Sequence, residues 1–427
     1  ALQISPGHLQ ATMSLGRLEE LEGNTAEAAA LYQGIIDSDA DSIAPLLALA
    51  RLAEKQGKSE TMANWLEQAR ERAPRDLRSR LMLAEYYIRE KQLVEADSLV
   101  QEALKIAPHQ PNVLALRGRA LMAEQRNNEA LKPLNELVTR APHSVLARAL
   151  LGETYLRLGQ SDDARRQLEY ALERQPNYVP ALVLMVQVEL QTDDHAQALE
   201  FARQIQNIRP ELDKGYELAG DALVAGGNYP EASLAYAQAW QLKQSSVLAV
   251  KLSDAKMRSA QSADATRPLL VWLEGHPDDA RALQFLGTTY QTLGEHGKAI
   301  ETYERLLAIK PDNGLALNNL AWLYSLSSDP KAIVYAEKAY IAYPDSAEIQ
   351  DTYGWILVQF GQVDKGRSLL KQAMEKLSKV PEVRYHYAVA LVKAGERDEG
   401  RKLLEQLLQS DRQFEGREDI QALLDQQ

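Results

Sequence analysis

The sequence predicts an all-α fold, in which amphipathic helix pairs repeat along the 427 residues as a solenoid. Prolines recur every 34 residues, at Pro74, Pro108, Pro142, Pro176 and Pro210 and again at Pro277 and Pro311. A small residue recurs with this period in each half of the repeat, and apolar residues follow helical spacing around it. One helix pair cannot bury its apolar face alone, so about twelve copies must stack on one another.

Residues 280–313 show the repeat unit most clearly. Gly287 and Ala299 are the small residues at which a first and a second helix approach closely. Gly294 breaks the first helix, and Pro311 marks the end of the second. In the same register, the repeats begin at Leu9, Ile43, Leu77, Pro111, Val145, Val179, Asp213, Ser246, Ala280, Gly314, Ala347 and Pro381.

The first seven repeats are regular. Several second helices are expected to begin at a residue whose side chain caps a free backbone N–H, namely Thr25, Ser59, Asn127 and Ser161. Pro133 and Pro268 lie deeper in second helices and are expected to bend or shorten them. Before the first repeat, residues 1–6 fit the last turn of a second helix, so we expect the chain to begin inside a repeat of a longer array.

Regularity fails around residues 244–268. Lys256 stands where Tyr290 stands in the next repeat, and Ser253 stands where Gly287 stands. An unpaired buried lysine is unfavourable, so this face is expected to stay open to water. The pattern therefore predicts an N-terminal subarray at 1–245, a degenerate repeat and hinge at 246–279, and a C-terminal subarray at 280–427. Residues 416–427 carry an apolar stripe and are expected to form a capping helix over the last repeat.

Composition and motifs argue against several classes of function. The formal net charge of −12 disfavours nucleic acid and polybasic membrane anchoring, and no apolar run reaches the roughly 18 residues of a transmembrane helix. With no cysteine, disulfides and thiolate metal sites are impossible. The seven histidines are scattered, and no hydrolase, zinc or dinucleotide motif occurs. We therefore expect neither an enzyme, nor a cofactor, nor a metal.

The 34-residue helix–turn–helix with its small residues and closing proline resembles the tetratricopeptide repeat, and the resemblance covers essentially the whole chain. It implies a right-handed α-solenoid whose first helices line the concave side, where ligands bind. The ninth residue of each repeat then lies on that side: Arg17, Arg51, Glu85, Arg119, Glu153, Gln187, Asp221, Asp254, Thr288, Trp322, Trp355 and Val389.

The aromatic end of this series, together with nearby hydrogen-bonding side chains, is typical of peptide or sugar recognition. The candidate surface consists of Gln284, Asn318, Asn319, Trp322, Asp351, Trp355, Gln359 and Tyr385. The alternative is that both tryptophans pack against adjacent helices as core residues. Two known tetratricopeptide specialisations are not matched. No repeat has the lysine and asparagine of the chaperone-tail clamp, and the asparagine ladder of sugar-transferase arrays is represented by Asn319 alone.

Residues 351–408 and the stretch ALNNLAWLY at 316–324 resemble the C-terminal repeats of bacterial lipoproteins from the exosortase (PEP-CTERM) protein-sorting and exopolysaccharide systems. That resemblance implies a non-enzymatic scaffold in the bacterial envelope or periplasm, with a lipoprotein signal upstream of Ala1; a cytoplasmic protein is the alternative. Three functions stay open. They are a scaffold holding a protein or extended peptide in the concave groove, a carbohydrate or peptide receptor using the aromatic surface, and the regulatory arm of an enzyme.

The degenerate repeat generates a first prediction. One poor interface lets a repeat array open locally while the remaining repeats stay folded. Amide hydrogen exchange should therefore be faster in residues 247–275 than in residues 145–175 and 280–310. Equal protection of the three segments would rule out the hinge.

Overall fold

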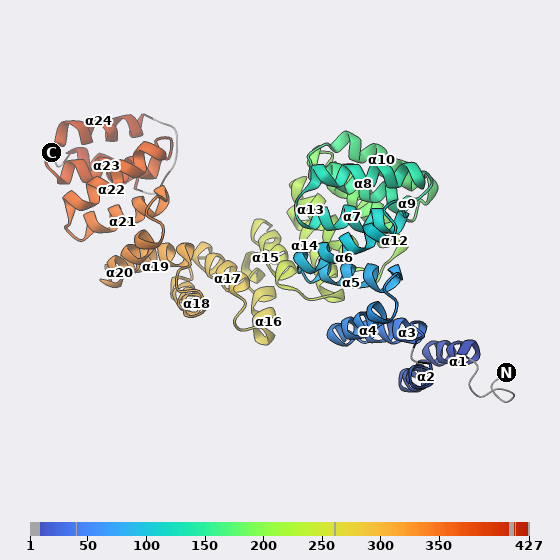
Figure 1. Ribbon diagram of the computed structural model, residues 1–427. Helices are drawn as coiled ribbons and strands as arrows, with labels where there is room; N and C mark the ends of the chain where they lie inside the picture. The colour runs from blue at the N-terminus through green and yellow to red at the C-terminus, as the bar shows by residue number, and fades with distance from the viewer. Residues whose placement is uncertain (1–8, 40, 260–261, 410–413, 415, 426–427) are drawn as a thin grey trace. The chain divides into compact units, whose positions relative to one another are not determined.

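The computed structural model describes residues 9–39, 41–259, 262–409, 414 and 416–425. In these residues, twenty-five α-helices and one short 3-10 helix (Ser262–Asp264) follow one another, and no strand occurs (Figure 1). Consecutive helices pack against each other along the chain, which confirms the predicted helical solenoid. Residues 1–8, on which the prediction of a truncated first repeat rests, lie outside the described residues.

Each repeat contributes a first and a second helix. The first helices are α1 (Leu9–Glu22), α3 (Ala44–Lys55), α5 (Leu77–Arg89), α7 (Pro111–Ala123), α9 (Val145–Arg157), α11 (Val179–Gln191), α13 (Asp213–Ala225), α15 (Ser246–Arg258), α17 (Ala280–Thr292), α19 (Gly314–Leu326), α21 (Ala347–Gln359) and α23 (Pro381–Lys393). The second helices are α2 (Thr25–Ser38), α4 (Ser59–Arg72), α6 (Leu93–Ile106), α8 (Asn127–Arg140), α10 (Ser161–Arg174), α12 (His195–Ile208), α14 (Tyr229–Leu242), α16 (Arg267–Gly275), α18 (His296–Ile309), α20 (Lys331–Ala342), α22 (Val363–Lys376) and α24 (Arg397–Leu408). All first helices begin at the predicted residue except α3, which begins one residue after Ile43.

The two helices of a repeat meet at the predicted small residue. In the repeat that begins at Ala280, a methyl group added to Gly287 would lie 2.5 Å from the ring of Tyr303 on α18, inside van der Waals contact. Tyr303 is 0% exposed, and its hydroxyl accepts a hydrogen bond from Asn319 Nδ2 at 2.8 Å. The same arrangement pairs Gly16 with Tyr32 and Gly220 with Tyr236. These contacts confirm that glycine is needed where the opposing residue is a tyrosine.

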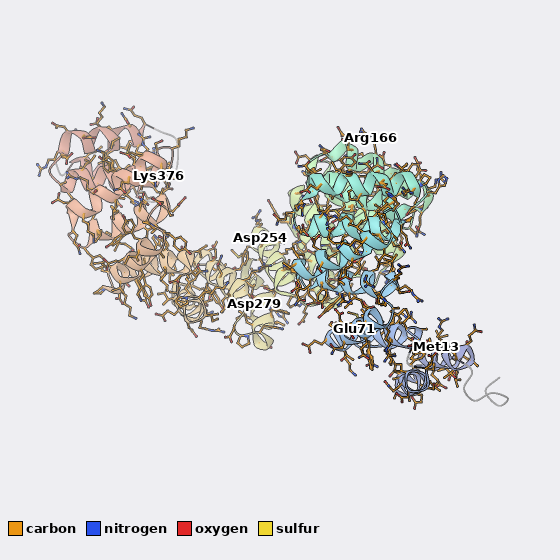
Figure 2. The ribbon with its side chains drawn as sticks, viewed as in Figure 1. Met13, Glu71, Arg166, Asp254, Asp279 and Lys376 are labelled. Carbon is orange, nitrogen blue, oxygen red and sulfur yellow. The ribbon has the colours of Figure 1, made fainter. Side chains whose placement is uncertain are left out.

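The capping prediction for the second helices is wrong. Thr25, Ser59, Asn127 and Ser161 are the first helical residues rather than the N-caps, and no side-chain cap bond forms at these four helix starts. The reason is that the N-cap position lies one residue earlier, at Asn24, Lys58, Arg126 and Gln160, in the turn that closes the first helix. The backbone N–H of Lys58, for example, donates to Ala53 O, a bond typical of a helix C-terminus. Side-chain caps occur instead at the first helices α5, α9, α15, α17, α19 and α21, and at the second helices α12 and α14. Asp279, labelled in Figure 2, accepts from the N–H of Ala282 at 3.0 Å.

The degenerate repeat differs from its prediction in one respect. The side chain of Lys256 is 16% exposed and forms an ion pair with Asp264, so this face is not open to water. The pair forms because the chain enters a 3-10 turn after α15, which brings Asp264 back to the helix. Pro268 does delay its helix, since α16 begins at Arg267 and has nine residues. Pro133 does not shorten α8, which keeps fourteen residues.

The chain divides into two compact units, Ala1–Pro210 and Glu211–Gln427. The predicted hinge at 246–279 lies inside the second unit and stays a prediction. The predicted capping helix is present as α25 (Asp419–Asp425), and Ile420, which is 0% exposed, packs with Leu404 and Leu407 of α24. Residues 426–427 of the predicted cap lie outside the described residues.

The close helix approach generates a second prediction. Gly287→Ala should lower the free energy of unfolding by about 1–3 kcal/mol, because the added methyl group overlaps a buried ring that has no room to move. Gly297→Ala in the neighbouring α18 is the matched control, since no atom lies within 4 Å of its added methyl group. The control should be neutral or more stable by up to about 1 kcal/mol. Urea unfolding followed by circular dichroism measures both, and equal midpoints for the two variants would contradict the packing argument.

Candidate binding site

First helices line the inner side of each unit. The more extensive contacts between helices that are not consecutive all join first helices of neighbouring repeats, within the described residues. In the first unit these are α5 with α7, α7 with α9 and α9 with α11, and in the second they are α15 with α17, α19 with α21 and α21 with α23. Helices on the inner side of a curved stack lie closer together than those outside. The first helices therefore form the inner face of each unit.

The structure brings four of the eight predicted residues together. Trp322 of α19, Trp355 and Gln359 of α21, and Tyr385 of α23 line one pocket of about 180 Å³ in the second unit. The rest of its lining is Ser325, Leu326, Glu382, His386, Gly416 and Asp419. Both tryptophans are half-buried, so neither is fully enclosed between helices. Three consecutive first helices thus place aromatic side chains around a single hollow.

The other four predicted residues do not line this pocket. Asn319 Nδ2 donates to Tyr303 on the preceding repeat, and Gln284 Oε1 accepts from Asn313 Nδ2 at 3.1 Å. Asn318 Oδ1 is buried without a hydrogen-bond partner among the described residues. Asp351 accepts from His386 Nδ1 at 3.0 Å. Gln284, Asn319 and Asp351 therefore form hydrogen bonds with neighbouring side chains of the array. A role of any of the four residues in ligand binding stays a prediction.

The aromatic groups of the pocket have fixed positions. The imidazole of His386 stacks on the indole of Trp355, with ring centroids 4.3 Å apart and planes 18° apart. The carboxylate of Asp351 orients that imidazole through its Nδ1. Tyr385 is 6% exposed, and burial, together with the nearby negative charge of Asp419, raises the pKa of its hydroxyl to about 12. The Tyr385 hydroxyl therefore stays neutral at physiological pH, and the negative charge of the pocket comes from the carboxylates of Glu382 and Asp419.

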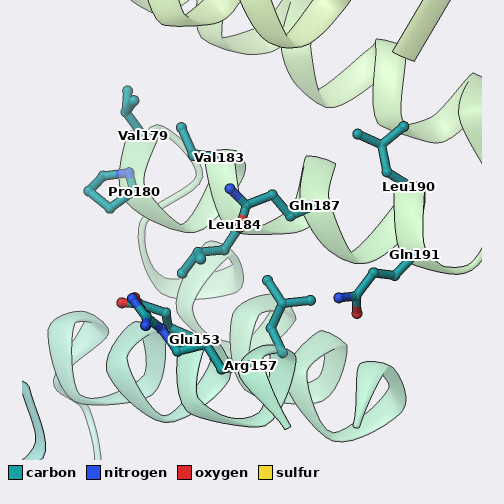
Figure 3. Close-up of a pocket in the computed structure, with 10 residues that line it drawn as sticks. Glu153, Arg157, Val179, Pro180, Val183, Leu184, Gln187, Leu190 and Gln191 are labelled. Carbon is teal, nitrogen blue, oxygen red and sulfur yellow. Dashed lines mark hydrogen bonds and ion pairs between the residues drawn. The ribbon is translucent and has the colours of Figure 1, made fainter. Parts of the chain in front are cut away.

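A larger groove on the first unit was not predicted. It has a volume of about 760 Å³ and lies between α9 and α11 (Figure 3). Its apolar lining is Leu156, Val179, Pro180, Val183, Leu184 and Leu190, and its polar lining is Glu153, Arg157, Gln187 and Gln191. The sequence carried a usable signal, since residues 179–190 are apolar on the inner side of the helix as well as on its core side. Of the residues that line this groove, only Glu153 and Gln187 are ninth residues of a repeat.

The acidic middle of the predicted inner face is neutralised internally. Lys251 Nζ of α15 lies 2.6 Å from Glu217 Oε1 and 2.7 Å from Asp221 Oδ1, both of α13. Burial disfavours the charged carboxylate of Glu217, but hydrogen bonds and charge from Lys251 and Lys214 outweigh it and lower its pKa. Asp221 also accepts a hydrogen bond from the hydroxyl of Tyr236 at 2.7 Å. These groups bind one another and leave no free carboxylate pair for a ligand.

No group of three or more potential metal ligands occurs among the residues that the structure describes. In the same residues, no helix is long and apolar enough to cross a bilayer.

Family models of the tetratricopeptide repeat match residues 1–43 and 47–111, residues 280–313 and residues 357–426. The model of the tetratricopeptide repeat protein 21 C-terminal ARM domain matches residues 107–281. No curated protein matches the sequence.

Two solved structures are similar to the chain. A tetratricopeptide repeat protein from Parabacteroides merdae ATCC 43184 is 16% identical with a TM-score of 0.46, and the match covers 58% of this chain and 98% of that one. A chain of the APC/C hetero-tetramer Cut9–Hcn1 is 13% identical with a TM-score of 0.43, and the match covers 96% of this chain and 94% of that one.

Proposed function

We propose that this chain, which tetratricopeptide-repeat models match in four segments, is a non-enzymatic scaffold that binds a protein partner on the inner face of its first helices. Arrays of this kind generally mediate protein–protein interaction, because stacked repeats present an extended surface that no single repeat could form. The observation that supports the proposal most is the groove between α9 and α11 of the first unit.

The groove has the size and composition of a recognition surface. Its volume of about 760 Å³ falls in the range of roughly 300–1,000 Å³ that is typical of specific ligand sites. Val183, Leu184 and Leu190 are only half-buried, so apolar area stays in contact with water until a partner covers it. Such an apolar floor with a polar rim is how protein interfaces are organised.

The rim supplies polar groups that a peptide backbone can use. Glu153 Oε1 and Arg157 Nη2 form an ion pair at 2.7 Å on the same helix, and their side chains are 29% and 45% exposed. An exposed pair of this kind contributes only about 0–1 kcal/mol to stability, so either group can exchange its partner at little cost. Gln187 and Gln191, on the facing helix, offer amide donors and acceptors. The groove is therefore suited to an extended or helical segment that carries apolar side chains.

The third prediction tests the groove with peptides selected from a display library on the full chain. The double variant Val183→Asp and Leu190→Asp should bind the selected peptides with an affinity lower by about tenfold or more, because a charge would then occupy the apolar floor of the groove. The matched control is Val94→Asp on the second helix α6, where the side chain is 82% exposed. The control should bind as the parent chain does, and thermal unfolding verifies that all three proteins are folded. Peptides that bind the double variant as tightly as the parent would exclude this groove.

A second candidate function is a carbohydrate or peptide receptor that uses the aromatic pocket. The supporting observation is the convergence of Trp322, Trp355 and Tyr385 from three consecutive first helices. A glycan array and a peptide array probed with the same labelled chain separate the two ligand classes.

We further propose a more specific role for this scaffold, namely that it acts in the bacterial envelope in protein sorting or exopolysaccharide assembly. The support is the resemblance of residues 351–408 and 316–324 to lipoproteins of those systems. Fractionation of source cells with an antibody against this chain should find the protein in the envelope fraction. A protein confined to the cytosolic fraction would contradict this localisation.

A further inference from the structure

We propose that the aromatic pocket of the second unit binds the guanidinium group of an arginine presented by a flexible peptide segment. This inference deepens the second candidate function by naming the chemistry of its ligand, and it is independent of the groove in the first unit.

The size of the pocket favours a single side chain. Its volume of about 180 Å³ is well below the roughly 300 Å³ at which sites for complete small ligands begin. One arginine side chain with its flat head group can enter such a space, whereas a branched oligosaccharide would contact it with one residue only. The peptide backbone on either side of the arginine would lie along the first helices, outside the pocket.

The aromatic lining favours a cation. Tryptophan attracts a cation above its ring more strongly than tyrosine does, and a guanidinium can also stack flat on an indole. Every cation–π contact found in the described residues falls on a tyrosine, such as that of Lys365 on Tyr353, and none falls on a tryptophan. Trp322 and Trp355 are thus half-exposed, and no described lysine or arginine contacts either indole face. His386 covers one face of the Trp355 indole, so a guanidinium would stack on Trp322 or on the opposite face of Trp355.

The charge of the lining favours the same ligand. Glu382 of α23 and Asp419 of α25 both line the pocket, and neither carboxylate forms an ion pair with a described residue. No lysine or arginine occurs among the lining residues. The one basic group is His386, whose Nδ1 is bonded to Asp351. A carboxylate binds a guanidinium through two parallel hydrogen bonds, a geometry that lysine cannot reproduce.

The wider electrostatics add to this preference. The formal net charge of −12 attracts a basic segment and repels an acidic one. Gln359 lies at the exposed edge of the pocket, where it can bond the peptide backbone. The size of the pocket, its aromatic faces and its carboxylates without an ion-pair partner among the described residues therefore point to one ligand class.

The fourth prediction uses blocked pentapeptides Gly-Gly-X-Gly-Gly, in which X is arginine, citrulline or lysine, titrated into the full chain. Citrulline has the shape of arginine without its charge. The indole N–H signals of Trp322 and Trp355 in nuclear magnetic resonance spectra report occupancy of the pocket. The arginine peptide should bind about tenfold more tightly than the citrulline peptide, and added salt should lower the affinity of the arginine peptide. Lysine should bind more weakly than arginine, because it cannot form the bidentate contact.

Variants of the lining carboxylates provide the second arm. The double variant Glu382→Gln and Asp419→Asn keeps the size of both side chains and should reduce arginine binding by about fivefold or more. Asp398→Asn, on the exposed first turn of α24 and outside the pocket lining, is the matched control and should leave binding unchanged. The groove variants Val183→Asp and Leu190→Asp should also leave it unchanged, which separates this proposal from the scaffold proposal.

Three results would overturn the proposal. The first is equal affinity for the arginine and citrulline peptides, and the second is the absence of any shift of the two indole signals at saturating arginine peptide. The third is a shift of the same signals by glucose or N-acetylglucosamine with higher affinity than by the arginine peptide, which would assign the pocket to a sugar.

Discussion

The two helices of each repeat approach so closely that the contact point has no space for a larger side chain, and the rest of the array depends on this constraint. Gly287 against Tyr303 is one instance, and the hydroxyl of that buried tyrosine also accepts a hydrogen bond from Asn319 of the following repeat. A single contact thereby sets the spacing within one repeat and the position of the next. Because each repeat packs mainly on its neighbours, the fold is specified locally, about 34 residues at a time.

Residue types at positions away from these contacts are less constrained by packing, and the inner face accordingly differs from repeat to repeat. Within the first unit, apolar residues of α11 such as Val183 and Leu190 face the groove, and no charge interrupts its floor. Within the second unit, α13 and α15 carry a closed network in which Lys251 neutralises Glu217 and Asp221. Farther along the same unit, a small pocket is lined by aromatic residues and by carboxylates that form no ion pair with a described residue. One backbone arrangement thus presents an apolar groove, an internally paired segment and an acidic aromatic pocket.

Much of this could be predicted from the sequence, because repeat register is a local property. The positions of Pro311 and Gly294 were sufficient to place helix ends, and the ninth residue of each repeat located Trp322 and Trp355 on one face. The failures involve interactions that register does not encode. The pairing of Lys256 with Asp264 depends on a 3-10 turn that breaks the repeat. Ser59 is not a cap because Lys58, one residue earlier, occupies the N-cap position. Repeat register does not predict the groove either, because its apolar residues cannot be distinguished from core residues in the sequence.

The central claim is that a partner binds the inner face formed by the first helices. Hydrogen exchange of the full chain, with and without a selected groove-binding peptide, tests this claim most directly. Binding on the inner face should slow amide exchange in α9 and α11 and leave exchange in α8 and α10 unchanged. Protection confined to the second helices, with α9 and α11 unaffected, would contradict it.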